Sequence, residues 1–72
     1  MIFFCNRLKS CRKALSLTQK ETANGLQLTE RAYQHYEAGT REPGLTMLVK
    51  LADFFDVSLD YLVGRSDDPK RH

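Results

Sequence analysis

The chain has 72 residues, of which 42% are apolar and 28% charged, with 11 Lys and Arg against 9 Asp and Glu. This length allows one domain with a small core and excludes a second domain. The composition is that of a soluble globular protein, and no run of residues is long enough to span a membrane. The apolar start, MIFFC, is too short for a signal peptide, so we expect a cytoplasmic protein.

The charges are unevenly distributed, although the net charge is only +2. Residues 1–50 carry 8 Lys and Arg against 4 Asp and Glu, whereas residues 51–72 carry 3 against 5. A basic excess in the first part is compatible with a nucleic-acid partner. On charge alone, however, the simpler interpretation is that these basic residues form the solvated face of a helix.

The first predicted helix covers residues 3–15, where apolar residues recur at the spacing of one helix face. The stripe consists of Phe4, Leu8, Cys11 and Leu15. Cys5 and Cys11 are six residues apart, roughly 240° around the helix axis, so we expect no disulfide between them. Cys11 is interpreted as a small core residue, because no other Cys, His or carboxylate has a metal-ligand spacing with it.

Two further helices begin close together. Thr18 followed by Glu21 matches a capping box, which predicts a helix ending near Gly25. Thr29 predicts a second helix start, with a helix running to about Ala38. Two helices of roughly eight residues are too short to persist alone in water, so flanking elements must hold them. We interpret the pair as a helix-turn-helix.

The helix over residues 29–38 has one apolar and one polar side. The polar side is rich in side chains that can bind base edges, namely Glu30, Arg31, Gln34 and His35. Taken singly, His35 is more simply interpreted as an ordinary exposed or core-edge histidine. Tyr33 and Tyr36 lie on the apolar side.

The rest of the chain predicts two more helices. Residues 38–44 form a loop with a Gly at each end and a Pro. A broad apolar stripe then predicts a central helix, and it contains Leu45, Met47, Leu48, Val49, Leu51, Ala52 and Phe55. Ser58 predicts the start of a short helix that stops at Gly64. We therefore expect an all-α fold of five helices over residues 1–65, and a flexible polar tail over residues 66–72.

Catalytic and metal-binding patterns are missing from the sequence. The four glycines are scattered, and no zinc, nucleophile or phosphate-loop motif occurs. Asp67 and Asp68 are adjacent in the predicted tail and lack the fixed separation that acid-base pairs need. We expect no enzyme activity, no metal, no cofactor and no small-molecule substrate.

From Arg7 to Gly64 the sequence resembles the helix-turn-helix domain of the Cro and lambda-repressor type. This family of transcriptional regulators is also called the xenobiotic response element-like family. The resemblance rests on three segments in one order, RLKSCRKALSLTQ, YEAGTREP and LVKLADFFDVSLDYLVG, and on Ala23. It implies a compact five-helix fold in which the second and third helices form the motif. It also implies that helix 29–38 enters the major groove of a double-stranded operator.

The same resemblance implies roles for individual residues. The phosphate-contacting positions are Gln19, Thr29 and Arg41, and the base-contacting positions are Glu30, Arg31, Gln34 and His35. Arg12 and Glu37 match a salt bridge that ties the first helix to the third. Gln27 and Asp56 stand where the family commonly has turn glycines, so both are expected in the left-handed conformation.

We expect a non-enzymatic, sequence-specific regulator that represses as a homodimer by occupying an operator. Phe54 is predicted to point away from the core residue Phe55, and together with Tyr61 it is assigned to the dimer interface. The alternative is a protein-binding adapter or antitoxin-like partner that uses the same fold for protein interaction.

Overall fold

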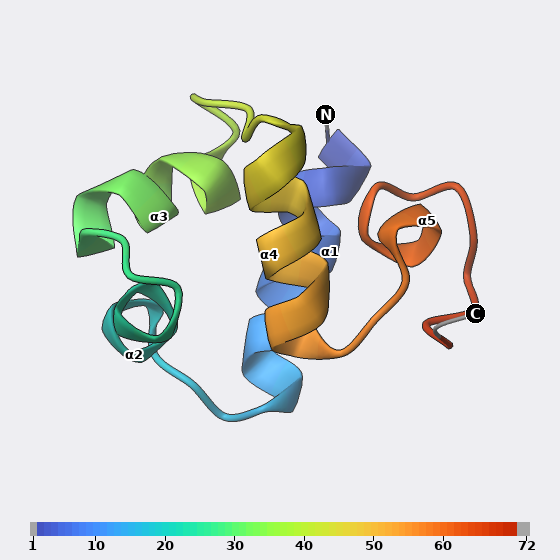
Figure 1. Ribbon diagram of the computed structural model, residues 1–72, viewed down its shortest axis with the longest axis horizontal. Helices are drawn as coiled ribbons and strands as arrows, with labels where there is room; N and C mark the ends of the chain where they lie inside the picture. The colour runs from blue at the N-terminus through green and yellow to red at the C-terminus, as the bar shows by residue number, and fades with distance from the viewer. Residues whose placement is uncertain (1, 71–72) are drawn as a thin grey trace.

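The computed structural model describes residues 2–70 and has five helices (Figure 1). They are α1 (Ile2–Ala14), α2 (Gln19–Gly25), α3 (Glu30–Ala38), α4 (Leu45–Phe55) and α5 (Leu59–Leu62). The residues that the structure describes contain no strand. The predicted all-α, five-helix fold is therefore confirmed, whereas residues 71–72 of the predicted tail lie outside the described part.

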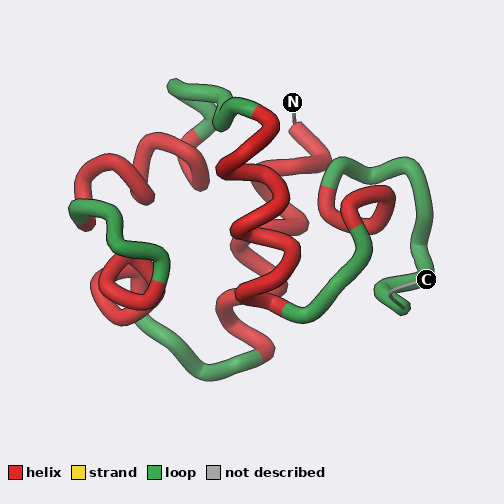
Figure 2. The backbone as a smooth tube through the Cα atoms, in the orientation of Figure 1, coloured by secondary structure: helices red, strands yellow, loops and turns green. Residues whose placement is uncertain are grey.

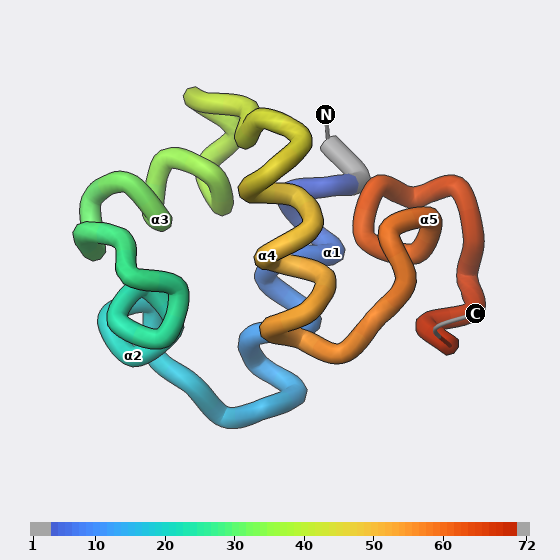
Figure 3. The backbone as a smooth tube through the Cα atoms, in the orientation of Figure 1, coloured from blue at the N-terminus to red at the C-terminus, as the bar shows by residue number. Residues whose placement is uncertain are grey.

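The helix-turn-helix unit and the C-terminal part lie on opposite sides of a central pair of helices. In Figure 1, α4 crosses in front of α1 in the middle, α2 and α3 are on the left, and α5 is on the right. The principal contacts join α2 to α3, α3 to α1, and α5 to both α1 and α4. Figure 2 shows that loops alone connect these elements. Figure 3 traces the chain from the central α1 to α2 and α3, back through the central α4, and on to α5.

The predicted helix starts are present with their side-chain caps. The Glu21 N–H donates to Thr18 Oγ1 at 3.0 Å while the Thr18 N–H donates to Glu21 Oε1 at 2.9 Å, which completes the capping box. The hydrogen bond from the Thr18 backbone lowers the pKa of the Glu21 carboxyl. Thr29 accepts from the Ala32 N–H at 3.1 Å. These bonds fix where the two short helices begin.

Among the described residues, three that are not glycine turn the chain with positive φ. Gln27 and Asp56 have φ of 59° and 56°, which confirms the conformation predicted for both. Ser16 has φ of 56° and was not predicted. It follows the end of α1 and redirects the chain toward the motif, so α1 cannot continue beyond Ala14.

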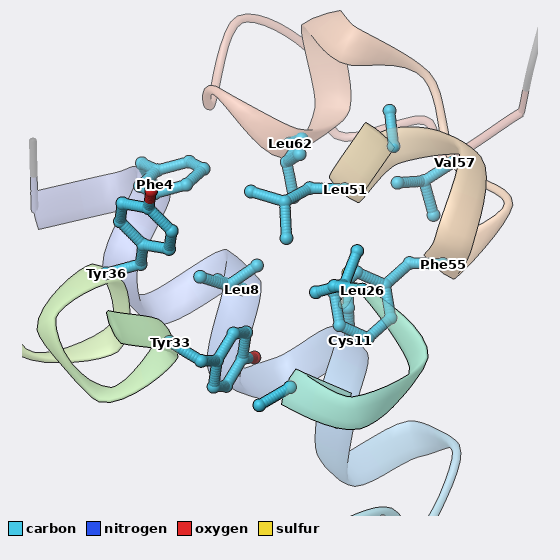
Figure 4. Packing of buried hydrophobic residues seen from close by; sticks show 12 residues of the cluster. Phe4, Leu8, Cys11, Leu26, Tyr33, Tyr36, Leu51, Phe55, Val57 and Leu62 are labelled. Atoms are coloured by element: carbon cyan, nitrogen blue, oxygen red, sulfur yellow. The ribbon is translucent and has the colours of Figure 1, made fainter. Parts of the chain in front are cut away.

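The core is formed by residues from all five helices and the turns between them (Figure 4). Phe4, Leu8 and Cys11 of α1 are buried as predicted. Leu15 was placed wrongly in this stripe: it is 51% exposed, because it comes after the last residue of α1. Burial of the Cys11 thiol raises its pKa, as expected of a core cysteine.

Helix α4 is central but less covered than its sequence predicts. Leu51, Ala52 and Phe55 are buried, whereas Leu45 and Val49 are 73% and 40% exposed. Leu45 and Val49 are one turn apart, so they share a side of the helix. The helix is central as predicted, but this side of its apolar stripe is left largely exposed.

The described part of the C-terminal segment folds back on α5. The Ser58 N–H at the start of α5 donates to the Pro69 carbonyl oxygen at 3.1 Å. Arg7 of α1 forms an exposed ion pair with Asp67 at 3.3 Å. The segment is polar as predicted, and its flexibility remains a prediction.

Candidate nucleic-acid interface

Helix α3 separates its side chains into a buried and an exposed side. Tyr33 and Tyr36 are buried, whereas Glu30, Arg31 and Gln34 are exposed. Because α3 lies at one edge of the molecule (Figure 1), its polar side faces outward. The residues predicted to contact bases therefore lie on an accessible surface, apart from His35, which is half-buried.

The start of α3 and the loop after it form one shallow hollow. Its lining consists of Thr29, Arg31, Ala32, His35 and Arg41. The sequence separates Arg41 from Arg31 by ten residues, yet the fold places both at this hollow. Two cations beside a helix N-terminus suit an anionic ligand such as a phosphate backbone.

Thr40 holds the far end of this surface, and its role was not predicted. Its hydroxyl lies 2.7 Å from His35 Nδ1, and its backbone N–H donates to the His35 carbonyl oxygen at 3.1 Å. These contacts position His35 at the point where α3 ends and Gly39 turns the chain with φ of 80°. The threonine next to a helix-ending glycine was the only sequence signal for this contact.

Arg12 and Glu37 form the ion pair that the family resemblance implies. Arg12 Nε lies 2.6 Å from Glu37 Oε2, and Arg12 Nη2 lies 3.2 Å from Glu37 Oε1. Only 2% of the Glu37 side chain is exposed. Arg12 also donates to the Leu17 carbonyl oxygen at 2.8 Å, so one side chain joins α1, α3 and the connection to α2.

Glu37 keeps its negative charge although its side chain is almost fully buried. Burial disfavours its carboxylate, but hydrogen bonds from Arg12 and Gln19 and the nearby Tyr33 hydroxyl outweigh this and lower its pKa. The Tyr33 hydroxyl is itself buried and has no hydrogen bond of standard geometry among the described residues. Burial raises the pKa of Tyr33, which keeps this hydroxyl protonated.

Gln19, the first residue of α2, links this cluster to the surface of α3. Its Nε2 donates to Glu37 Oε1 at 3.2 Å, and its Oε1 accepts from Gln34 Nε2 at 3.3 Å. Gln34 Nε2 also donates to Glu30 Oε2 at 3.3 Å. Gln19 is half-buried, so it lies at the junction of the two motif helices rather than projecting freely.

Phe54 and Tyr61, assigned from sequence to a dimer interface, reach the surface only in part. Both are half-buried against the core. The Phe54 ring packs edge-on against Phe55, with centroids 5.1 Å apart, and would contact any Cβ added at Gly25. The Arg7 guanidinium lies 4.0 Å above the Tyr61 ring. Phe54 therefore reaches the surface only in part, because its ring packs against Gly25 at the end of α2.

A metal site and a membrane-spanning helix are both absent from the described residues. Among residues 2–70, no group of three or more His, Cys, Asp or Glu side chains is placed to hold a metal ion. None of the helices described is both long and apolar enough to cross a membrane.

A helix-turn-helix family model matches residues 8–62, which include all of α2 to α5 and the second half of α1. The chain belongs to the Cro/C1-type helix-turn-helix family. The matched segment contains every residue assigned here to DNA contact. The motif helices are α2 and α3, as the sequence resemblance implies.

Several curated bacterial proteins are similar to the chain. The uncharacterized HTH-type transcriptional regulator YobD of Bacillus subtilis is 42% identical over 92% of this chain and 59% of its own length. The HTH-type transcriptional regulator ImmR of the same organism is 36% identical over 92% and 52%. The cryptic phage CTXphi transcriptional repressor RstR of Vibrio cholerae is 39% identical over 82% and 53%. The chain thus spans little more than half the length of these relatives, and no solved structure matches it significantly.

Proposed function

We propose that this chain binds double-stranded DNA sequence-specifically, with α3 in the major groove, and represses transcription by occupying an operator. The observation that carries the proposal is the exposed polar side of α3, with Arg31 and Arg41 at one hollow. An α-helix fits the major groove, where side chains of this kind can bind base edges. The names of the similar proteins, which are transcriptional regulators and a repressor, support the same role.

The residues of the proposed interface divide into two groups. Glu30, Arg31 and Gln34 face base edges because they lie on the exposed side of α3. The half-buried His35 joins them from the hollow that it lines with Arg31 and Arg41. Thr29, Arg41 and Gln19 contact phosphates, since they lie at the helix N-termini and in the following loop. Base contacts determine sequence preference, whereas phosphate contacts position the protein on any duplex.

Binding to a duplex selected from a random pool tests this division. We expect log K to fall by about five per decade of salt if a dimer neutralises roughly six phosphates. Arg31→Ala should weaken binding to the selected site by about 1 to 3 kcal/mol and leave binding to random DNA nearly unchanged. Arg41→Ala should instead weaken both about equally, because Arg41 is assigned to phosphate alone.

Fluorescence anisotropy titrations at several salt concentrations measure these effects. Salt-insensitive, weak binding would reject DNA as the ligand and favour the protein-binding adapter. An equal loss for Arg31→Ala on both kinds of DNA would place Arg31 on phosphate.

We also propose that two copies bind one operator, because a single α3 reads few bases and family dimers read half-sites about 34 Å apart. The sequence assigns the contact surface to Phe54 and Tyr61, whose side chains are partly exposed. A second candidate is the more exposed pair Val49 and Leu59, which line one hollow between α4 and α5. Exposed apolar residues that gather in one region are typical of contact surfaces.

Sedimentation equilibrium of two double variants tests the dimer and its surface. Phe54→Glu with Tyr61→Glu removes the originally assigned aromatics, and circular dichroism must show that it folds, because both are half-buried. Val49→Glu with Leu59→Glu changes side chains that are already exposed and serves as the better-tolerated pair. A wild type that stays monomeric with operator present, or dimers of both variants, would reject the surface.

A further inference from the structure

A chain of hydrogen bonds runs from the buried ion pair to the outward side of α3. Glu37, held by Arg12, accepts from Gln19 Nε2 at 3.2 Å. Gln19 Oε1 accepts from Gln34 Nε2, and Gln34 Nε2 also donates to Glu30 Oε2, each at 3.3 Å. The chain begins at a carboxylate that is 2% exposed and ends at two exposed side chains.

The chemistry of Glu37 determines the direction of every bond in this chain. An ionised carboxylate only accepts hydrogen bonds, so Gln19 must turn its amide nitrogen toward Glu37. The Gln19 carbonyl oxygen then faces Gln34 and can only accept, which requires Gln34 to turn its own nitrogen inward. The two N–H groups of the Gln34 amide are used by Gln19 and Glu30. The opposite arrangement would place the Gln19 oxygen against the Glu37 carboxylate, where the two acceptors repel.

Acceptor atoms are therefore what remains at this part of the surface. Both N–H groups of the Gln34 amide are bonded within the protein, so only its carbonyl oxygen is free to bind a base. The Glu30 carboxylate also offers acceptor atoms only. A glutamine usually binds adenine with its oxygen and nitrogen together, but here the nitrogen is committed within the protein.

We propose that Glu37 acts as a positioning residue that makes the Gln34 and Glu30 positions selective for bases carrying an exocyclic amino group. On the contacted strand these bases are adenine, through N6, and cytosine, through N4. Guanine and thymine present only acceptors at the corresponding major-groove atoms and are disfavoured. This inference rests on the proposed function, because it specifies which base chemistry the same surface recognises.

The experiment begins with wild-type protein and duplexes selected from a random pool. Gln34→Ala identifies the base position that depends on Gln34, and all four bases are then compared there. We expect the wild type to prefer adenine or cytosine over guanine and thymine by roughly fivefold or more, the range of one good base contact.

Two variants then interrupt the chain at different points. Glu37→Gln keeps the size of the side chain but lets its amide donate or accept, so Gln19 and Gln34 are free to reverse. Gln19→Met leaves the Arg12–Glu37 pair intact and removes the link, which keeps the test decisive if Glu37→Gln does not fold. We expect both variants to reduce the amino-base preference to within about twofold, while the preference at the position that depends on Arg31 stays unchanged.

The outcomes separate this inference from the function on which it rests. No sequence preference on any duplex would reject the proposed function, and the inference with it. Specific binding with a guanine or thymine preference at the Gln34 position, or with no position that depends on Gln34, would reject the inference alone. So would an amino-base preference that survives in both Glu37→Gln and Gln19→Met.

Discussion

Two arginines of α1 pair with carboxylates far along the chain, and the two ion pairs differ in how much water reaches them. On the motif side, the side chains of Arg12 and Glu37 are 13% and 2% exposed. On the C-terminal side, Arg7 is 18% exposed, while its partner Asp67 is fully exposed. Water competes for the second pair and screens it, so the second pair contributes little to stability. The first pair is shielded, and losing one partner leaves the other charge without compensation.

The C-terminal side is held by packing instead. The Arg7 guanidinium lies over the Tyr61 ring, and Leu62 of α5 is fully buried. These contacts involve flat or apolar surfaces and do not depend on one carboxylate. The motif side thus depends on the Arg12–Glu37 ion pair, which both orients the helices and stabilises the fold. The C-terminal side depends instead on the surface area that its side chains bury.

The largest expected effect comes from breaking each ion pair in turn. Glu37→Ala should lower the free energy of unfolding by about 3 kcal/mol, because it leaves Arg12 partly buried without its partner. Asp67→Ala, the matched control on the other side of α1, should lower it by less than about 1 kcal/mol. Urea unfolding followed by circular dichroism measures both. Equal losses would mean that burial does not distinguish the two pairs.

Acid should remove the contribution of the Arg12–Glu37 ion pair to the free energy of unfolding. The folded state lowers the pKa of Glu37 below its ordinary value of 4.5. Its contribution is therefore fully present above pH 4.5 and is lost as the pH falls through the lowered pKa of the folded state. We expect wild type to exceed Glu37→Gln in unfolding free energy at pH 7, and this difference to shrink steadily below pH 4.5.

Comparing these two proteins isolates Glu37, since the capping-box carboxylate Glu21 also has a lowered pKa and is present in both. Urea titrations at a series of pH values give the difference directly. A difference that stays constant from pH 7 down to pH 3 would show that ionisation of Glu37 does not stabilise the fold.

Much of the fold could be predicted from interactions between residues close in sequence. Which sides of a helix are buried by other helices could not be predicted in this way. The Thr18 and Thr29 caps depend on neighbouring residues only, and they were predicted correctly. The left-handed conformation of Gln27 was also predicted correctly, but from the family resemblance. Periodicity shows which apolar residues share a helix side but not whether another element covers that side. For that reason neither the exposure of Val49 nor the half-burial of Phe54 followed from the pattern.

The candidate site shows the same division. The resemblance supplied the residues of the interface and the Arg12–Glu37 pair, because each follows from a position in a motif. It did not supply the bond between Gln19 and Gln34, which are 15 residues apart and meet only because α2 packs on α3. Thr40 was missed for a similar reason, since its contact requires the turn after α3.

The smallest expected effects concern the turns on the two sides. Gln27, in the turn of the motif, has φ of 59°, whereas Gly64, after α5, has φ of 85°. A side chain in this conformation costs roughly 1 kcal/mol, and glycine avoids that cost. Gln27→Gly should therefore stabilise the protein by about 0.5 kcal/mol, since the greater freedom of glycine in the unfolded chain offsets part of the gain.

Gly64→Ala is the matched reverse change and should destabilise by about 1 kcal/mol. Urea unfolding of both variants beside wild type measures the two differences, and DNA binding of Gln27→Gly shows whether the motif keeps its geometry. If Gln27→Gly lowers the stability, the Gln27 side chain itself must hold the turn between α2 and α3. The motif side would then be stabilised by the Gln27 side chain in addition to the side chains that contact Glu37.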